Sequence, residues 1–297
     1  MTAIATPRVR ASAAPGRWRR VLGRVPTHAV VIFLMFVWLI PTIGLLVNSF
    51  RPPTEVTSSG WWTAIFAPSQ LGLDNYAHVL SQSGLWPAFI NSLFITIPAT
   101  IIPIFVAAFA AYAFAWMSFP GRNILFVAIV GLLVVPLQST LIPVLQLFKT
   151  FGLNGQFLAV WLAHTGYGLP FAIYLLRNFM GELPREVFES ANIDGAGPAT
   201  SFFRLALPMT IPAIAALAIF QFLFVWNDLL VALTYIGAAN PENQPLTVVV
   251  ANLVNSLGGG WQFLAAAAFV STALPFAVFL ALQRYFVRGL TGGAVKG

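Results

Sequence analysis

The sequence predicts an all-α membrane protein, a single domain of six transmembrane helices with both chain termini in the cytoplasm. Hydrophobic residues make up 59% of the 297 positions and charged residues only 8%, whereas soluble domains carry about 25% charged residues. The mean hydropathy is +0.84. This composition excludes a disordered chain, a nucleic-acid-binding domain and an ordinary cytosolic enzyme.

Six stretches are long and apolar enough to cross a bilayer, which takes about 20 predominantly apolar residues. The second and fifth are long enough to tilt, kink or extend beyond the bilayer. The six predicted spans are His28–Phe50, Ala88–Met117, Ile124–Phe148, Phe157–Leu176, Leu205–Ile236 and Phe263–Phe286.

The distribution of basic residues predicts the orientation of these spans. Of the 15 basic residues, all except Arg51 and Lys149 fall on one side, and cytoplasmic loops are the ones enriched in Lys and Arg. We therefore expect cytoplasmic tails at 1–27 and 287–297, flanking a six-helix transmembrane domain at 28–286. The same rule explains the net charge of +7 without nucleic acid. The Arg-rich start is interpreted as preceding an uncleaved span, with a mitochondrial transit peptide as the less favoured alternative.

Three segments are predicted to lie outside the bilayer: external loops at 51–87 and 237–262, and a cytoplasmic loop at 177–204. The cytoplasmic loop holds half of the eight acidic residues. The chain has no cysteine, which excludes disulfides and thiolate chemistry. Its three histidines have no metal-ligand spacing, so no metal site is expected.

The cytoplasmic loop has the local signals of two helices joined by a tight turn. Pro184 can open a helix, because its missing N–H would have no partner there. Gly195 can end that helix in a left-handed conformation, and Pro198 can open the next one. The second helix would lead through Phe202 and Phe203 to Leu207-Pro208.

This loop resembles the EAA loop of binding-protein-dependent ABC importer permeases. That pattern is Glu-Ala-Ala, three residues, Gly, nine residues, Ile, one residue and Leu-Pro. Here Glu189-Ser190-Ala191, Gly195, Leu205 and Leu207-Pro208 reproduce every gap, with Ser190 and Leu205 as the two departures. The similarity extends to Asp74-Asn75-Tyr76, Asn91-Ser92, Ala110 to Phe114, Trp226-Asn227-Asp228 and the tail from Arg284 to Gly297. The sequence thus looks like a maltose-type sugar permease.

The resemblance implies that the loop is a coupling helix that docks in a cleft of a cytoplasmic ATPase. Glu189 would pair with a basic residue of the ATPase, while Phe188, Ala191 and Gly195 would pack in the cleft. The residues implied in this coupling are Glu186, Phe188, Glu189, Ser190, Ala191, Asp194, Gly195 and Ala196. An amphipathic surface helix with a solvated charged face is the structural alternative.

The glycine-rich tail lacks the Gly-Lys-Ser/Thr order and the flanking elements of a phosphate-binding loop. By the resemblance it would reach the ATPase through Gly293 and Lys296; the alternative is a frayed chain end.

Two groups of polar residues are candidates for the substrate path. Asp228 is an acidic residue in the predicted fifth span, and such residues normally face protein or water. Beside it, Asn227 could contact a sugar and Trp226 could stack on one; the alternative is an interhelical hydrogen bond that fixes packing. Gln138 and Ser139 lie between Pro136 and Pro143, where the prolines permit a kink that could form a gate.

The function implied by the resemblance is one half of the translocation path of an ATP-driven sugar importer in a bacterial inner membrane, with an oligosaccharide or α-glucoside as the favoured substrate. A second permease, two ATPase subunits and a solute-binding protein would be its partners. The chain itself would bind no cofactor and would not be an enzyme, since ATP and Mg would sit on the ATPase. Alternatives are a polyol, a monosaccharide or a glycerol phosphate as substrate, or an ion-driven secondary transporter, which often needs several buried ionisable groups and repeated halves.

Overall fold

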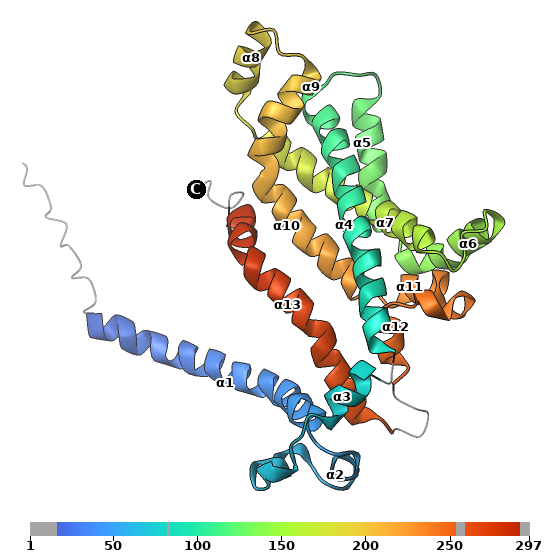
Figure 1. Ribbon diagram of the computed structural model, residues 1–297. Coiled ribbons are helices and arrows are strands. Elements are labelled where there is room, and N and C mark those ends of the chain that lie inside the picture. Colours follow the sequence, from blue (N-terminus) through green and yellow to red (C-terminus); the bar gives the residue numbers. More distant parts are fainter. Residues whose placement is uncertain (1–16, 82–83, 254–258, 292–297) are drawn as a thin grey trace, which may run out of the picture.

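The computed structural model describes residues 17–81, 84–253 and 259–291, and every regular element in these ranges is helical (Figure 1). Five long helices form the body: α1 (Arg17–Ser49), α4 (Leu85–Trp116), α7 (Phe157–Gly181), α10 (Leu207–Trp226) and α13 (Trp261–Thr291). Each contains a stretch long and apolar enough to span a bilayer. The all-α polytopic fold is therefore confirmed.

Short helices connect these five. On the side of the first external loop lie α2 (Pro53–Ser58), η1 (Trp61–Ile65), η2 (Pro68–Gln70) and α3 (Asp74–Ser81). Between α4 and α7 lie α5 (Arg122–Gly131), η3 (Leu132–Val134) and α6 (Leu137–Thr150). The remaining elements are α8 (Arg185–Ile193), α9 (Pro198–Ser201), η4 (Phe202–Ala206), α11 (Leu230–Tyr235), η5 (Gly237–Ala239), η6 (Pro241–Asn243) and α12 (Leu246–Ala251).

The predicted third span is a broken one. Its two parts, Arg122–Val134 and Leu137–Thr150, meet at an angle of 102°, so the described chain has five candidate spans, or six if this pair counts as one. The break falls at Pro136, which precedes the first residue of α6 in an extended conformation. A proline disfavours helical backbone in the residue before it. Pro143 lies inside α6 without interrupting it, so only one of the two prolines marks the bend.

The predicted fifth span also ends earlier than expected. Instead of one helix from Leu205 to Ile236, α10 ends at Trp226 and a separate α11 begins at Leu230. Asp228 lies in the break, where its carboxylate oxygens accept hydrogen bonds from the backbone N–H groups of Val231 (3.3 Å) and Ala232 (3.0 Å). A carboxylate satisfies the unpaired donors at a helix start and interacts favourably with the helix dipole. Asp228 is thus a cap, outside the long helix.

The core lies where α4, α7 and α10 pack together. Ala107, Ala108 and Ala111 of α4 are buried in one cluster with Ile173 and Leu176 of α7. Small residues let membrane helices approach closely and gain van der Waals contact. This contact stabilises the packing, because in lipid the hydrophobic effect does not drive helices together.

Helix α7 also approaches α10 closely at Gly168. A Cβ on Gly168 would lie 2.8 Å from Oε1 of Gln221, a residue of α10 whose side-chain amide donates to the carbonyl of Ala99 in α4 (3.1 Å). A side chain at position 168 would displace this link among the three helices.

Helix α1 lies apart from this core and contacts the bundle near one end (Figure 1). Only 6% of its apolar window is buried. The rest of the helix presents apolar side chains outward.

The first external loop is tied to the end of α1 by a buried arginine. Arg51 is fully buried and donates to the side chain of Asn48 and to the carbonyls of Glu55 and Ser59. Asn75 of α3 donates to the carbonyls of Ser49 (3.0 Å) and Arg51 (2.7 Å). Arg51 lies on the side of the predicted spans where basic residues are scarce. Its hydrogen bonds to the loop give a structural reason for a basic residue there.

Asn75→Ala should lower the free energy of unfolding of this loop by about 1–3 kcal/mol, because two buried carbonyls lose their donor. Thermal unfolding of the detergent-solubilised protein, followed by tryptophan fluorescence, measures the loss. Ser81→Ala is the matched control, since its exposed hydroxyl bonds only within α3, to Ala77. Equal stability of the two variants would contradict the role of Asn75.

Candidate functional site

The loop at 177–204, which the charge bias predicts to be cytoplasmic, folds as predicted into a helix, a tight turn and a second helix. Helix α8 begins after Pro184, and Gly195 ends it at φ +83°, a conformation that glycine adopts without strain. The N–H groups of Asp194 and Ala196 return to the carbonyls of Ser190 (3.0 Å) and Ala191 (2.9 Å). Pro198 then opens α9. The loop lies at one end of the bundle, opposite α3 and α12 (Figure 1).

One surface of the loop is acidic and ends in an exposed apolar residue. Glu186, Glu189, Ser190 and Asp194 are exposed. Ile193 is 87% exposed. Ala191 and Ala196 are half-buried and Gly195 is exposed. Within the described part of the chain Glu189 is in no ion pair, so its charge is available to a partner.

Phe188 corrects one expectation. Its side chain is only 4% exposed and stacks on Trp116, the last residue of α4, with ring centroids 3.9 Å apart and planes inclined by 20°. The Trp116 indole N–H also donates to the carbonyl of Met180 near the end of α7 (2.9 Å). Phe188 therefore does not reach into a partner's cleft; it fastens α8 to the bundle.

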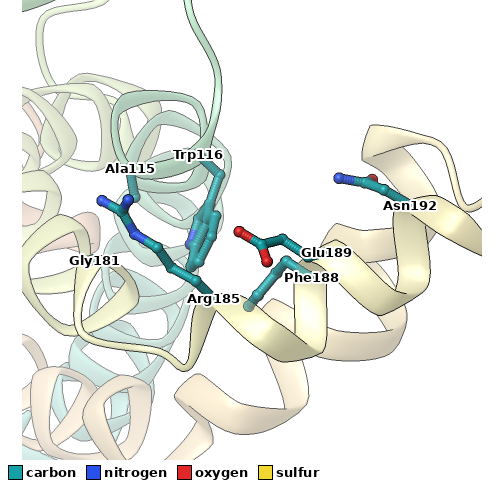
Figure 2. Close-up of a pocket in the computed structure, with 7 residues that line it drawn as sticks. All are labelled: Ala115, Trp116, Gly181, Arg185, Phe188, Glu189 and Asn192. Atoms are coloured by element: carbon teal, nitrogen blue, oxygen red, sulfur yellow. The ribbon is translucent and has the colours of Figure 1, made fainter.

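A pocket of about 290 Å³ lies between α8 and the ends of α4 and α7. Figure 2 shows Arg185 and Glu189 on the side of α8 that faces Trp116, with Asn192 farther along the helix. The pocket is lined by Ala115, Trp116, Gly181, Arg185, Phe188, Glu189 and Asn192. It offers a cation and an anion beside Trp116, with an amide farther along α8.

The second arm of the loop is also fastened to α4. Phe202 is buried and stacks on Phe109, with centroids 4.6 Å apart, and meets Tyr112 edge-on at 5.3 Å. Residues Phe202–Ala206 form a π-helical turn before α10. Such turns are rare and frequently occur at functional sites.

The predicted sugar-contacting group at 226–228 is divided by the structure. Trp226 is 2% exposed, stacks on Phe222 and donates to the carbonyl of Ser271 in α13 (3.1 Å). Its proposed stacking on a sugar is therefore wrong, because the ring is enclosed in the core. Asn227 is exposed and donates to the carbonyl of Leu223 in its own helix (2.8 Å).

Asp228 faces the buried imidazole of His164. Its Oδ2 lies 3.7 Å from the His164 Nε2, and neither His164 nitrogen has a hydrogen-bond partner. The backbone carbonyl of Asp228 accepts from Thr247 (2.7 Å). The packing interpretation of Asp228 fits these contacts, since it joins α7, the break and α12.

Gln138 and Ser139 lie in the first turn of α6, directly after the bend, and both are exposed. Ser139 donates to the carbonyl of Pro136 (2.7 Å). The adjacent Thr140 donates to the hydroxyl of Tyr167, which is 2.9 Å from that of Tyr235. The bend is therefore attached to α7 and α11 by a chain of hydroxyls, with two polar side chains left facing outward.

Gly293 and Lys296 lie outside the described residues. Two other residues were missed by sequence reasoning. Trp116 gave one signal, an indole at the last position of a span directly before a polar turn. Arg51 gave another, a basic residue on the side where basic residues are scarce.

A bundle of apolar helices with an exposed helix-turn-helix at one end defines a polytopic membrane protein. Residues 12–292 match the family described as binding-protein-dependent transport system inner membrane component. The chain belongs to that family.

Curated relatives match along nearly their whole length. An osmoprotective compounds uptake permease of Synechocystis sp. is 52% identical, over 92% of both chains. An alpha-glucoside transport system permease of Rhizobium meliloti is 39% identical, over 91% of this chain and 96% of the relative. A trehalose transport system permease of Mycobacterium tuberculosis is 34% identical, over 87% and 93%.

Solved structures share the fold. A chain in the crystal structure of a bacterial ABC transporter involved in the import of the acidic polysaccharide alginate superposes with a TM-score of 0.73 at 20% identity, over 93% of this chain and 100% of that one.

Phe188→Ala should release α8 from the bundle, because removing a buried phenylalanine costs about 3–5 kcal/mol. Hydrogen–deuterium exchange of α8 amides should accelerate, while the amides of α7 keep their protection. Ile193→Ala is the control, because Ile193 is exposed and its truncation should leave exchange unchanged. Slow exchange in Phe188→Ala would show that the stack does not fasten the loop.

Proposed function

We propose that this chain is the transmembrane permease subunit of an ATP-driven importer that takes up a sugar, with an α-glucoside or oligosaccharide as the first candidate. The observation that carries the proposal is the exposed acidic helix α8, placed at one end of the bundle in a chain of the binding-protein-dependent family. The transport systems to which the relatives belong, for alpha-glucoside and for trehalose, support the substrate class.

Helix α8 is proposed to dock in an ATPase subunit. Glu189 supplies an unpaired carboxylate and Ile193 an exposed apolar side chain, a combination that suits a charge pair surrounded by an apolar contact. Glu186, Ser190, Asp194, Gly195 and Ala196 complete that surface. The ATPase would bind ATP and Mg, and this chain would contribute no catalytic group and no cofactor.

The translocation path is proposed to form between this chain and a second, homologous permease. Helix α1 is unburied in the single chain and the outward-facing Gln138, Ser139 and Asn227 have no partner from another helix of the described chain. A second subunit would cover apolar surface and complete a polar path. Alternating access would follow, with closure of the ATPases moving the coupling helices and switching the spans between inward and outward states.

The loop at 237–262 is the proposed contact for a solute-binding protein. A solved alginate transporter of the same fold has been seen in complex with an alginate pentasaccharide-bound periplasmic protein. The charge bias supports a cytoplasmic location of both termini in a bacterial inner membrane. In the described residues two ion pairs are present: Arg51–Glu55, which follows the first long helix, and His164–Asp228, in which only the histidine is fully buried. So few buried ionisable groups favour an ATP-driven importer over an ion-driven transporter.

Glu189→Lys should abolish recovery of the ATPase with the tagged chain, because the reversed charge meets the basic residue that Glu189 pairs with, and losing such a pair costs about 2–5 kcal/mol. Co-purification from detergent-solubilised native membranes, quantified by mass spectrometry, is the measurement. Glu182→Lys is the matched control, an exposed carboxylate in the turn before α8. Undiminished recovery of the ATPase with Glu189→Lys would exclude the docking role.

The substrate class is tested in membrane vesicles by ATP-dependent uptake of labelled trehalose, maltose and sucrose, beside glycerol, glucose and glycerol 3-phosphate. Saturable uptake of an α-glucoside supports the proposal. Uptake of only a polyol, a monosaccharide or a glycerol phosphate would contradict the proposed substrate class. Uptake that survives ATP depletion would contradict the proposed ATP-driven mechanism.

The tail that carries Gly293 and Lys296 is proposed to reach the ATPase. Deleting residues 289–297 should lower ATP hydrolysis by the purified complex while membrane insertion is unchanged. If the complex with the truncated chain hydrolyses ATP as fast as the complex with the full-length chain, the tail has no role in ATP hydrolysis and the proposal is wrong.

A further inference from the structure

Helix α4 holds residues 242–246, within the loop predicted to be external, with two consecutive polar side chains. The Asn91 amide donates to the carbonyls of Glu242 (2.7 Å) and Gln244 (3.1 Å). The Ser92 hydroxyl accepts from the N–H of Leu246, the first residue of α12, in a buried contact of 2.8 Å. We call these three bonds the polar clamp. All of them reach backbone groups, so they fix the position of the loop whatever its side chains are.

The other end of α4 holds the cytoplasmic loop with aromatic rings. Trp116 stacks on Phe188 of α8, and its indole N–H is bonded to Met180. One turn and two turns earlier, Tyr112 and Phe109 pack on Phe202, so both arms of the loop end on the same helix. We call these contacts the aromatic clamp.

Between the clamps α4 is one continuous helix, in which Pro98 and Pro103 do not break the helical backbone. Asn91 and Trp116, the outermost residues of the two clamps, are about 38 Å apart along its axis, at about 1.5 Å per residue. Helix α4 has buried residues along this whole length, from Ser92 and Ile95 to Ala111, and its alanines at the aromatic end pack in one cluster with α7. Helix α10 joins the same two loops through the chain, but the π-helical turn η4 and the break at Asn227–Leu229 interrupt it at both ends.

We infer that α4 is a rigid link that transmits a displacement of the external loop to the coupling helix α8, with Asn91 and Trp116 as its positioning residues. This inference rests on the proposed function, in which a binding protein meets the loop and an ATPase meets α8. Neither residue contacts the substrate. Their task is to make the loop and α8 move with α4.

A double-mutant cycle of Asn91→Ala and Trp116→Leu tests the link. Distant sites that act independently have additive effects on free energy, hence multiplicative effects on rates. The importer is purified from its own membranes through a tag on this chain and placed in nanodiscs. The quantity measured is the ratio of ATP hydrolysis with and without its solute-binding protein, which is saturated with trehalose, maltose or sucrose.

A rigid link predicts that each single variant lowers this stimulation about tenfold, the equivalent of 1.4 kcal/mol, and that the double variant is no worse than the lower single. A product of the two effects, about a hundredfold, would overturn the inference, as would full stimulation in either single variant. If the unmodified importer shows no stimulation at all, the proposed function has failed and the link fails with it; the two failures are thus distinguishable.

Matched variants guard against misfolding. Asn91→Asp keeps the shape of the side chain without the N–H donors and should behave like Asn91→Ala. Trp116→Phe keeps an aromatic ring on Phe188 and should retain more stimulation than Trp116→Leu; if the latter does not assemble, the cycle is run with Trp116→Phe. Thr150→Ala, an exposed hydroxyl bonded within α6, should combine multiplicatively with either variant.

Discussion

Helix α4 lies along α7 through a face of alanines, and this close contact supports nearly every other feature of the fold. Lipid tails are as apolar as leucine, so membrane helices associate by tight van der Waals packing and by hydrogen bonds instead of by the hydrophobic effect. Ala107 and Ala111 provide the packing, and the Gln221 amide adds a hydrogen bond to the backbone of α4. The external loop and the cytoplasmic loop then both rest on a helix that is itself held firmly.

The polar residues near the membrane serve this framework more than they serve a substrate. Asp228 caps α11, Asn91 holds the external loop and Arg51 holds the segment after α1. Each satisfies backbone groups that would otherwise be unpaired where water is scarce. The side chains still facing outward, Gln138, Ser139 and Asn227, are the candidates for the path that we propose this chain shares with a second subunit.

Much of this could be predicted from the sequence because it depends on local signals. Apolar runs located the long helices, and the positions of Pro184, Gly195 and Pro198 located the helix-turn-helix. The breaks within the predicted spans were harder to predict. An apolar run does not show that Asp228 will cap a new helix, since its partners are N–H groups that become free only once α10 has ended. Trp226 and Phe188 were misassigned for a related reason: only the fold shows which aromatic rings are enclosed, here by Phe222 and Trp116.

Cross-linking from position 193 tests most directly that α8 is the docking element of an importer. The chain contains no cysteine, so Ile193→Cys introduces a unique thiol at an exposed position of the loop, and Thr57→Cys gives a control thiol on an exposed residue of α2, in the loop predicted to be external. In native membranes a thiol-reactive cross-linker should join position 193 to an ATPase subunit, and position 57 should not give that product. An importer complex that forms normally without any cross-link from position 193 to the ATPase would contradict the account.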